Sequence, residues 1–172
     1  MNERTSTARV ALKWGGVLGI ALILFSLILY LTDNTSNAAL GAVTYLFMAV
    51  GIVLAMREYR TLNSGYMTYG EGLGLGALTA TISGLLSSLF SVFYTTVIDT
   101  GIMERASDKI REQLEDRGVP DEQIDQQMEM MQMFQSPGLL FVFGVIGSAF
   151  IGLLLSLVIA AFMRRNNPNP FD

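Results

Sequence analysis

Hydrophobic residues dominate four long stretches of the chain, and charged residues gather between them. Asp, Glu, Lys and Arg are absent from four intervals: 14–32, 34–56, 72–98 and 130–163. A helix needs about 20 apolar residues to cross about 30 Å of hydrocarbon, and backbone polar groups in lipid must be hydrogen-bonded within the element. The pattern therefore predicts one membrane domain over residues 1–172 with four transmembrane helices, at 12–31, 38–56, 71–97 and 138–163.

The loop between the third and fourth of these helices, residues 99–136, has a helical pattern of its own. Apolar residues recur at helical spacing on either side of Gly118 and Pro120, at Ile102, Ala106, Ile110 and Leu114 and then at Ile124, Met128 and Met131. Such spacing places each set on one face of a helix, and the Gly and Pro mark an end and a start. We predict an all-α fold, a four-transmembrane-helix bundle with an extracytoplasmic amphipathic helical hairpin. A solvated, partly disordered loop is the alternative.

The distribution of basic residues predicts the orientation. Seven basic residues flank the membrane helices on one side: Arg4, Arg9, Lys13, Arg57, Arg60, Arg164 and Arg165. The loop 99–136 on the other side carries four basic residues against ten acidic ones. Since Lys and Arg favour the cytoplasmic side, we predict that both termini are cytoplasmic. Residues 36–38 imitate a signal-peptide cleavage site, but the preceding apolar run exceeds the usual length of about 7–15 residues, so we expect the first helix to be retained.

Composition narrows the chemistry that this chain can perform. Of 172 residues, 51% are hydrophobic and 15% are charged, and His and Cys are absent. Without them the commonest general base, the commonest metal ligand and thiolate nucleophiles are missing. We predict a protein that is not an enzyme and has no cofactor, no catalytic site and no nucleic-acid partner. Methionine thioethers could bind Cu(I), and a packing face is the other interpretation of the cluster Met128, Met130, Met131 and Met133.

Small residues recur every four positions in two of the predicted membrane helices. One ladder consists of Gly72, Gly76, Ala80, Gly84 and Ser88, and the other of Gly144, Ser148, Gly152, Ser156 and Ala160. Residues four apart share a helix face, and small side chains let membrane helices approach closely. We predict antiparallel packing of the two helices along the ladders. Two alternatives are that one ladder faces another subunit, or that small residues are simply frequent in membrane helices.

The glycines also resemble a dinucleotide-binding pattern, "GLGLGA" at residues 72–77. That motif is meaningful between a strand and an amphipathic helix, whereas here it opens an apolar run. A shorter small-residue pair occurs at Gly15 and Gly19. We therefore favour helix packing over nucleotide binding.

Glu71 is an acidic residue at the start of a predicted membrane helix. Its charge complements the positive helix N-terminus, so we expect it either to cap that helix or to form an interfacial ion pair with Lys13 or Arg60. Because acids within membranes are often functional, a role in ion or proton coupling is the alternative.

Three segments give the chain a resemblance to a known family: "YRTLNSGYMTYGEGLGLGALTATISGLLSSLF" (59–90), "LEDRGVPDEQIDQQMEMMQMFQSPG" (114–138) and "GSAFIGLLLSLVIAAFMRR" (147–165). They look like the DUF4199 family of small bacterial integral membrane proteins of unknown function. The resemblance implies a four-helix protein of the bacterial inner membrane with a substantial external segment. It implies no catalytic residues.

These patterns favour a non-enzymatic membrane subunit or scaffold. Its partners would be the lipid bilayer and either a second copy or another membrane protein, met through the acidic hairpin and the small-residue seams. The alternative is a small oligomeric channel or transporter lined by the hydroxyl-rich face of the third helix: Thr79, Thr81, Ser83, Ser87 and Thr95.

Overall fold

The computed structural model describes residues 6–166 and contains six α-helices and one π-helical turn within that range. In chain order the elements are α1 (Thr7–Leu31), α2 (Ala38–Leu62), α3 (Tyr69–Phe93), η1 (Tyr94–Ile98), α4 (Ile102–Asp116), α5 (Asp121–Phe134) and α6 (Pro137–Met163). Arg4, one of the predicted orienting charges, lies outside the described residues. The all-α prediction is confirmed.

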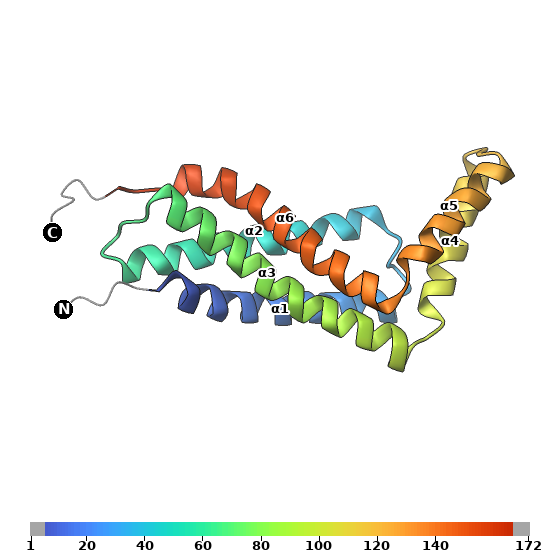
Figure 1. Ribbon diagram of the computed structural model, residues 1–172, viewed down its shortest axis with the longest axis horizontal. Coiled ribbons are helices and arrows are strands. Elements are labelled where there is room, and N and C mark those ends of the chain that lie inside the picture. The colour runs from blue at the N-terminus through green and yellow to red at the C-terminus, as the bar shows by residue number, and fades with distance from the viewer. Residues whose placement is uncertain (1–5, 167–172) are drawn as a thin grey trace.

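Four of the helices, α1, α2, α3 and α6, are long and apolar enough to cross a membrane, α3 together with η1. Figure 1 shows them running in alternately opposite directions along one bundle, with the start of α1 and the end of α6 at one end and α4 and α5 at the other. The protein is a multi-pass membrane protein. The helices extend beyond the apolar runs: α1 begins at Thr7 and α2 continues to Leu62.

The core of the bundle is built around α3, which packs most extensively against α6 and α1. Its largest group of buried side chains lies toward the end where the termini are, and includes Ile52, Met56 and Tyr59 of α2 together with Leu75 of α3. Large apolar side chains elsewhere on the long helices are exposed, as expected where lipid is the surrounding solvent.

The end of the bundle that holds the termini is closed by a short backbone pairing. Met67, in the connection between α2 and α3, accepts a hydrogen bond of 2.8 Å from the Arg165 N–H and donates one of 2.9 Å to the Arg165 carbonyl. The turn before it contains Gly65 at φ +86°, a left-handed conformation that glycine adopts without a Cβ clash. This pairing attaches the residues after α6 to the start of α3.

At the opposite end, α3 widens into the π-helical turn η1. The Tyr94 ring stacks on Tyr30 of α1 with centroids 4.5 Å apart, and the Tyr30 hydroxyl lies 2.6 Å from Ser91 Oγ. The sequence predicted a transmembrane helix over 71–97, and the structure has a candidate span over Tyr69–Ile98 whose α-helical part ends at Phe93 and continues as η1. Apolar periodicity carries no signal for this change of pitch.

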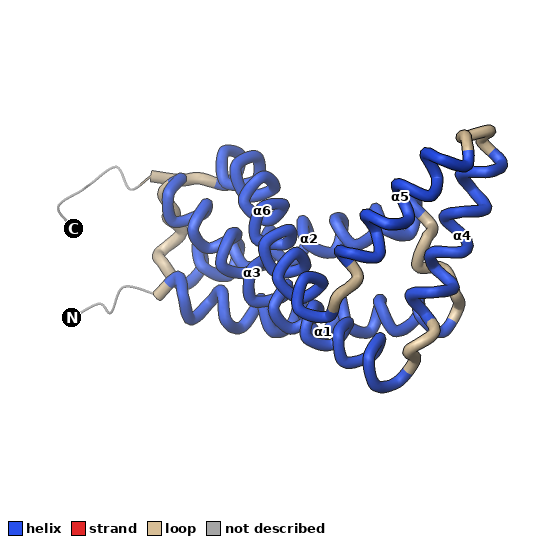
Figure 2. Tube along the Cα trace, turned by 45° about the vertical axis from the view of Figure 1, so that its right-hand side comes forward, coloured by secondary structure: helices blue, strands red, loops and turns tan. Residues whose placement is uncertain are grey.

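Helices α4 and α5 form a hairpin that projects beyond the bundle and leans to one side of its axis (Figures 1 and 2). Gly118 at φ +72° follows α4, and the Val119 N–H returns to the Leu114 carbonyl at 3.1 Å, the bond of a glycine-terminated helix end. On α5, Ile124 and Met128 are buried. Pro137 then opens α6 in its first turn, where its missing N–H leaves no bond unmade.

Candidate functional site: helix seams and the base of the hairpin

The two small-residue ladders lie against each other, α3 on α6. The ladders meet in five residue pairs, each of which we call a rung. Every rung places a glycine of one helix opposite an alanine or serine of the other: Gly72 with Ala160, Gly76 with Ser156, Ala80 with Gly152, Gly84 with Ser148, and Ser88 with Gly144. A Cβ added at Gly76 would lie 2.9 Å from the Ser156 Cβ, and one added at Gly144 would lie 3.1 Å from the Ser88 Cβ. The backbones approach because each rung has only one side chain to accommodate.

Each ladder therefore packs against the other ladder of the same chain. Gly76, Ala80, Gly152 and Ser156 are buried by this contact. The alternative in which one ladder faces another subunit differs from this arrangement, since neither ladder is left on the lipid-facing surface. The seam is therefore a contact within the chain that holds α3 against α6.

A second close contact joins α1 to the neighbouring face of α3. A Cβ added at Gly15 would lie 2.7 Å from the Ile82 Cβ and 3.0 Å from the Thr79 carbonyl oxygen. One turn further along, a Cβ at Gly19 would lie 2.8 Å from Leu86 Cδ1. The sequence marked these glycines as a small seam without assigning them a partner.

The five hydroxyl groups of the predicted path, in α3 and η1, donate hydrogen bonds to backbone carbonyls three or four residues earlier in the chain. Thr79 and Ser83 are fully buried, and they donate hydrogen bonds to the carbonyls of Leu75 (2.7 Å) and Ala80 (2.9 Å). The remaining hydroxyls of the predicted path do the same, Thr81 to Ala77, Ser87 to Gly84 and Thr95 to Val92. These groups satisfy their polar atoms without water, as hydroxyls in membrane helices commonly do.

Glu71 completes a capping box at the start of α3. Its carboxylate accepts hydrogen bonds from the Thr68 N–H (2.7 Å) and the Thr68 hydroxyl (2.9 Å), while the Glu71 N–H donates to Thr68 Oγ1 (3.3 Å). The buried Tyr59 also donates to it, at 2.9 Å. Glu71 therefore caps the N-terminus of α3, which is one of the two structural roles expected from the sequence.

The cation Lys13 has a different partner from the one expected. Its ammonium group lies 2.8 Å from a carboxylate oxygen of Glu58, which also accepts from the Trp14 indole N–H at 2.8 Å. The expected pair of Lys13 with Glu71 is replaced because α2 continues past its apolar run and carries Glu58 alongside α1. Arg60, the other expected partner of Glu71, instead lines a groove between α2 and α6.

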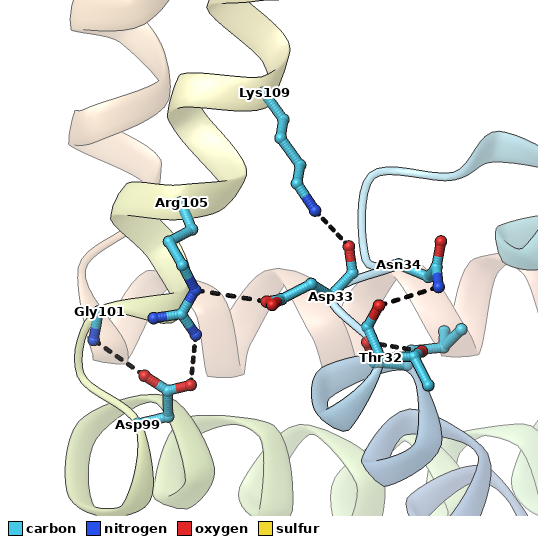
Figure 3. A network of polar contacts seen from close by, with 8 residues as sticks. Thr32, Asp33, Asn34, Asp99, Gly101, Arg105 and Lys109 are labelled. Atoms are coloured by element: carbon cyan, nitrogen blue, oxygen red, sulfur yellow. Dashed lines mark hydrogen bonds and ion pairs between the residues drawn. The ribbon is translucent and has the colours of Figure 1, made fainter.

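A cluster of charges joins the base of the hairpin to the turn between α1 and α2 (Figure 3). Arg105 of α4 lies between two carboxylates, paired with Asp99 and 3.3 Å from Asp33 Oδ1, and Lys109 donates to the Asp33 carbonyl. The pKa of Asp99 is lowered, chiefly by the hydrogen bond from Arg105. We refer to Asp33, Asp99, Arg105 and Lys109 as the hairpin latch. Sequence spacing could not reveal it, because Asp33 and Arg105 are far apart in the chain.

Further contacts hold the hairpin together and join it to α6. Arg111 of α4 lies 2.9 Å from Asp125 of α5, and the Gln135 amide donates to Ser107 at 2.8 Å. Phe134 meets Phe143 of α6 edge to face, with ring centroids 5.4 Å apart. The hairpin is thus attached to the bundle at both of its ends.

The methionines of α5 lie on different sides of the helix. Met128 is buried, whereas Met130 and Met133 are 56% and 67% exposed and line a shallow depression with Gln126 and Glu129. The four thioethers of the predicted cluster therefore do not converge on one point, which a Cu(I) site requires. Among residues 6–166, no group of three or more acidic side chains is placed to hold a metal ion.

Comparison with known proteins identifies a family for nearly the whole chain. The family described as "Protein of unknown function (DUF4199)" matches residues 13–165. No curated protein and no solved structure matches the chain.

Proposed function

We propose that this chain, which belongs to the DUF4199 family of proteins of unknown function, is a non-enzymatic membrane subunit or scaffold that presents its helical hairpin to a partner. The observation that carries the proposal is the hairpin latch. Arg105 and Lys109 attach α4 to the turn at Asp33, far from it in the chain, so the hairpin has a defined position relative to the bundle. A surface held in place in this way is pre-organised for binding, which lowers the entropy cost of association.

The surface that we assign to the partner is the outer face of α5. It combines the exposed side chains of Met130 and Met133 with Gln126 and Glu129 on the same side of the helix. Methionine adapts its shape to different apolar partners, and acidic groups around it supply orientation. The small-residue ladders are engaged within the chain, whereas this face of α5 is exposed and open to a second protein or a second copy.

We further propose that the protein lies in the inner membrane of a bacterium with both termini in the cytoplasm. In support of this orientation, the start of α1 and the ends of α2 and α6 lie at the same end of the bundle (Figure 1). Six basic residues lie at or next to these helix ends: Arg9, Lys13, Arg57, Arg60, Arg164 and Arg165. The hairpin at the other end is rich in acids. Under the positive-inside rule the hairpin then lies outside the cytoplasm.

A photoreactive reporter at Gln126 tests the scaffold role directly. In native membranes we expect a discrete protein adduct, identified by its mass, that weakens when Met130 or Met133 is replaced by Gln. The same reporter at Gln113, exposed on α4, is the matched control and should not give this adduct. Capture of lipid and solvent alone from both positions would remove the basis for a scaffold.

The alternative, an oligomeric channel or transporter, is separated by flux measurements on the purified protein in liposomes. Saturable or ion-selective flux would favour transport. The burial of Thr79 and Ser83 leads us to expect no such flux.

A further inference from the structure

A groove opens between α2 and α6 at the end of the bundle that holds the termini. Its α6 wall is apolar and includes Val158 and Phe162, which are 59% and 87% exposed. On the α2 side Val53 continues this apolar lining, and Arg57 and Arg60 follow toward the helix end. The groove thus changes from apolar to cationic along the direction from the membrane interior to its surface.

The two guanidinium groups of this groove are not neutralised by the described part of the chain. Arg57 and Arg60 are three residues apart and so share a face of α2. No carboxylate among residues 6–166 forms an ion pair with either of them. The Nε of Arg60 is also buried without a hydrogen-bond partner within those residues. A buried donor left unpaired costs free energy, so an anion at this position would stabilise the arrangement.

The chemistry of the groove fits one ligand that the surrounding bilayer supplies. A guanidinium fork binds phosphate oxygens through paired, charge-assisted hydrogen bonds. Basic pockets between membrane helices at the membrane surface suit lipid headgroups, and the apolar wall beside them suits an acyl chain. Inorganic phosphate would use only the cationic end and leave the apolar wall without a partner.

We propose that this groove binds an anionic phospholipid, with Arg57 and Arg60 on the headgroup phosphate and with Val158 and Phe162 beside an acyl chain. The site is independent of the hairpin, which lies at the opposite end of the bundle (Figure 1). It would bind the lipid whether or not the hairpin binds a partner.

Native mass spectrometry of the detergent-solubilised protein, given equal amounts of phosphatidylglycerol and phosphatidylcholine, tests the proposal. We expect preferential retention of phosphatidylglycerol by the unmodified protein. The double variant Arg57→Gln with Arg60→Gln should reduce that preference about tenfold or more, since each basic residue contributes to the attraction. The matched control, Arg164→Gln with Arg165→Gln, removes the same charge near the same end from exposed residues outside the groove lining and should retain the preference.

Three results would overturn the proposal. The first is equal retention of the two lipids by the unmodified protein, and the second is an equal loss of preference in both double variants, which would indicate general charge attraction. The third is complete displacement of the lipid by millimolar inorganic phosphate, which would indicate a phosphate site. If the groove variant does not fold, the single variant Arg57→Gln, at an exposed position, should still lower the preference, and an unchanged preference would contradict the proposal.

Discussion

Gly84 of α3 and Ser148 of α6 pack so closely that a Cβ added to Gly84 would lie 2.5 Å from the Ser148 Cβ. A side chain added at Gly84 could fit beside Ser148 only if α3 and α6 moved apart. This rung and the four like it form the most extensive contact between two helices of the described chain.

Replacing Gly84 with Ala should destabilise the protein by about 1–3 kcal/mol, the usual cost of inserting a methyl group into a packed interface. Gly74→Ala is the matched control, because a Cβ at Gly74 meets nothing within 4 Å. It should be neutral or slightly stabilising, since alanine is the better helix former. Steric-trapping or thermal unfolding in detergent measures both variants.

The exchange of residues across this rung gives a sharper test of the contact. Gly84→Ser combined with Ser148→Gly keeps one side chain in the rung and should recover most of the stability that Gly84→Ser loses alone. A double-mutant cycle measures this coupling. Additive effects would show that the two positions do not contact each other.

Gly15 and Gly16 are adjacent in α1, but only Gly15 lies against α3. Gly15→Ala should lower the free energy of unfolding by about 1–3 kcal/mol, because the added Cβ would meet Ile82 and the Thr79 carbonyl. Gly16→Ala should not lower it, because a Cβ there meets nothing within 4 Å. Equal unfolding free energies for the two variants would contradict this contact.

Protonation of Asp99 should loosen the hairpin. The pKa of Asp99 lies below its ordinary value of 3.8 because of Arg105, so its contribution is fully present above pH 3.8 and is lost as the pH falls through the lowered pKa. At neutral pH, Asp99→Asn should reproduce the acid state and increase amide hydrogen exchange in α4 severalfold. Asp108→Asn, at an exposed position on the same helix, is the control. Equal exchange in both variants would argue against the latch.

Loss of the capping box should weaken the start of α3. Thr68→Val and Glu71→Ala each remove hydrogen bonds of this box, so each should lower the free energy of unfolding by about 1 kcal/mol. If Glu71 served ion coupling instead, Glu71→Ala would leave stability unchanged and alter flux in liposomes. Unfolding and flux measurements on the same variants separate these roles.

The proposed orientation can be checked by labelling introduced cysteines. Because the natural sequence has no Cys, only the new residue can react. In right-side-out vesicles a membrane-impermeant maleimide should label Gln113→Cys directly, and Asn166→Cys only after permeabilisation. The reverse pattern would place the hairpin in the cytoplasm.

The features that could be predicted from the sequence are those that depend on helical geometry alone. The absence of charge from four intervals predicts four long helices, and a spacing of four residues places Gly76 and Gly84 on one face whatever surrounds them. The salt bridge of Lys13 with Glu58 was not predictable, because it depends on how far α2 extends beyond its apolar run. The pairing of Asp33 with Arg105 depends on where two distant turns meet, and no local pattern encodes that.

The order of glycines and larger small residues along α3 and α6 also determines which turn of one helix meets which turn of the other. If α6 slid by one turn in one direction, Gly76 would face Gly152 and Ala80 would face Ser148, leaving a void next to a crowded rung. Sliding the other way would bring Ser88 against Ser148 and Gly84 against Gly152. The native alignment has one side chain at every level, so two helices that meet by diffusion in the bilayer can recognise their correct offset.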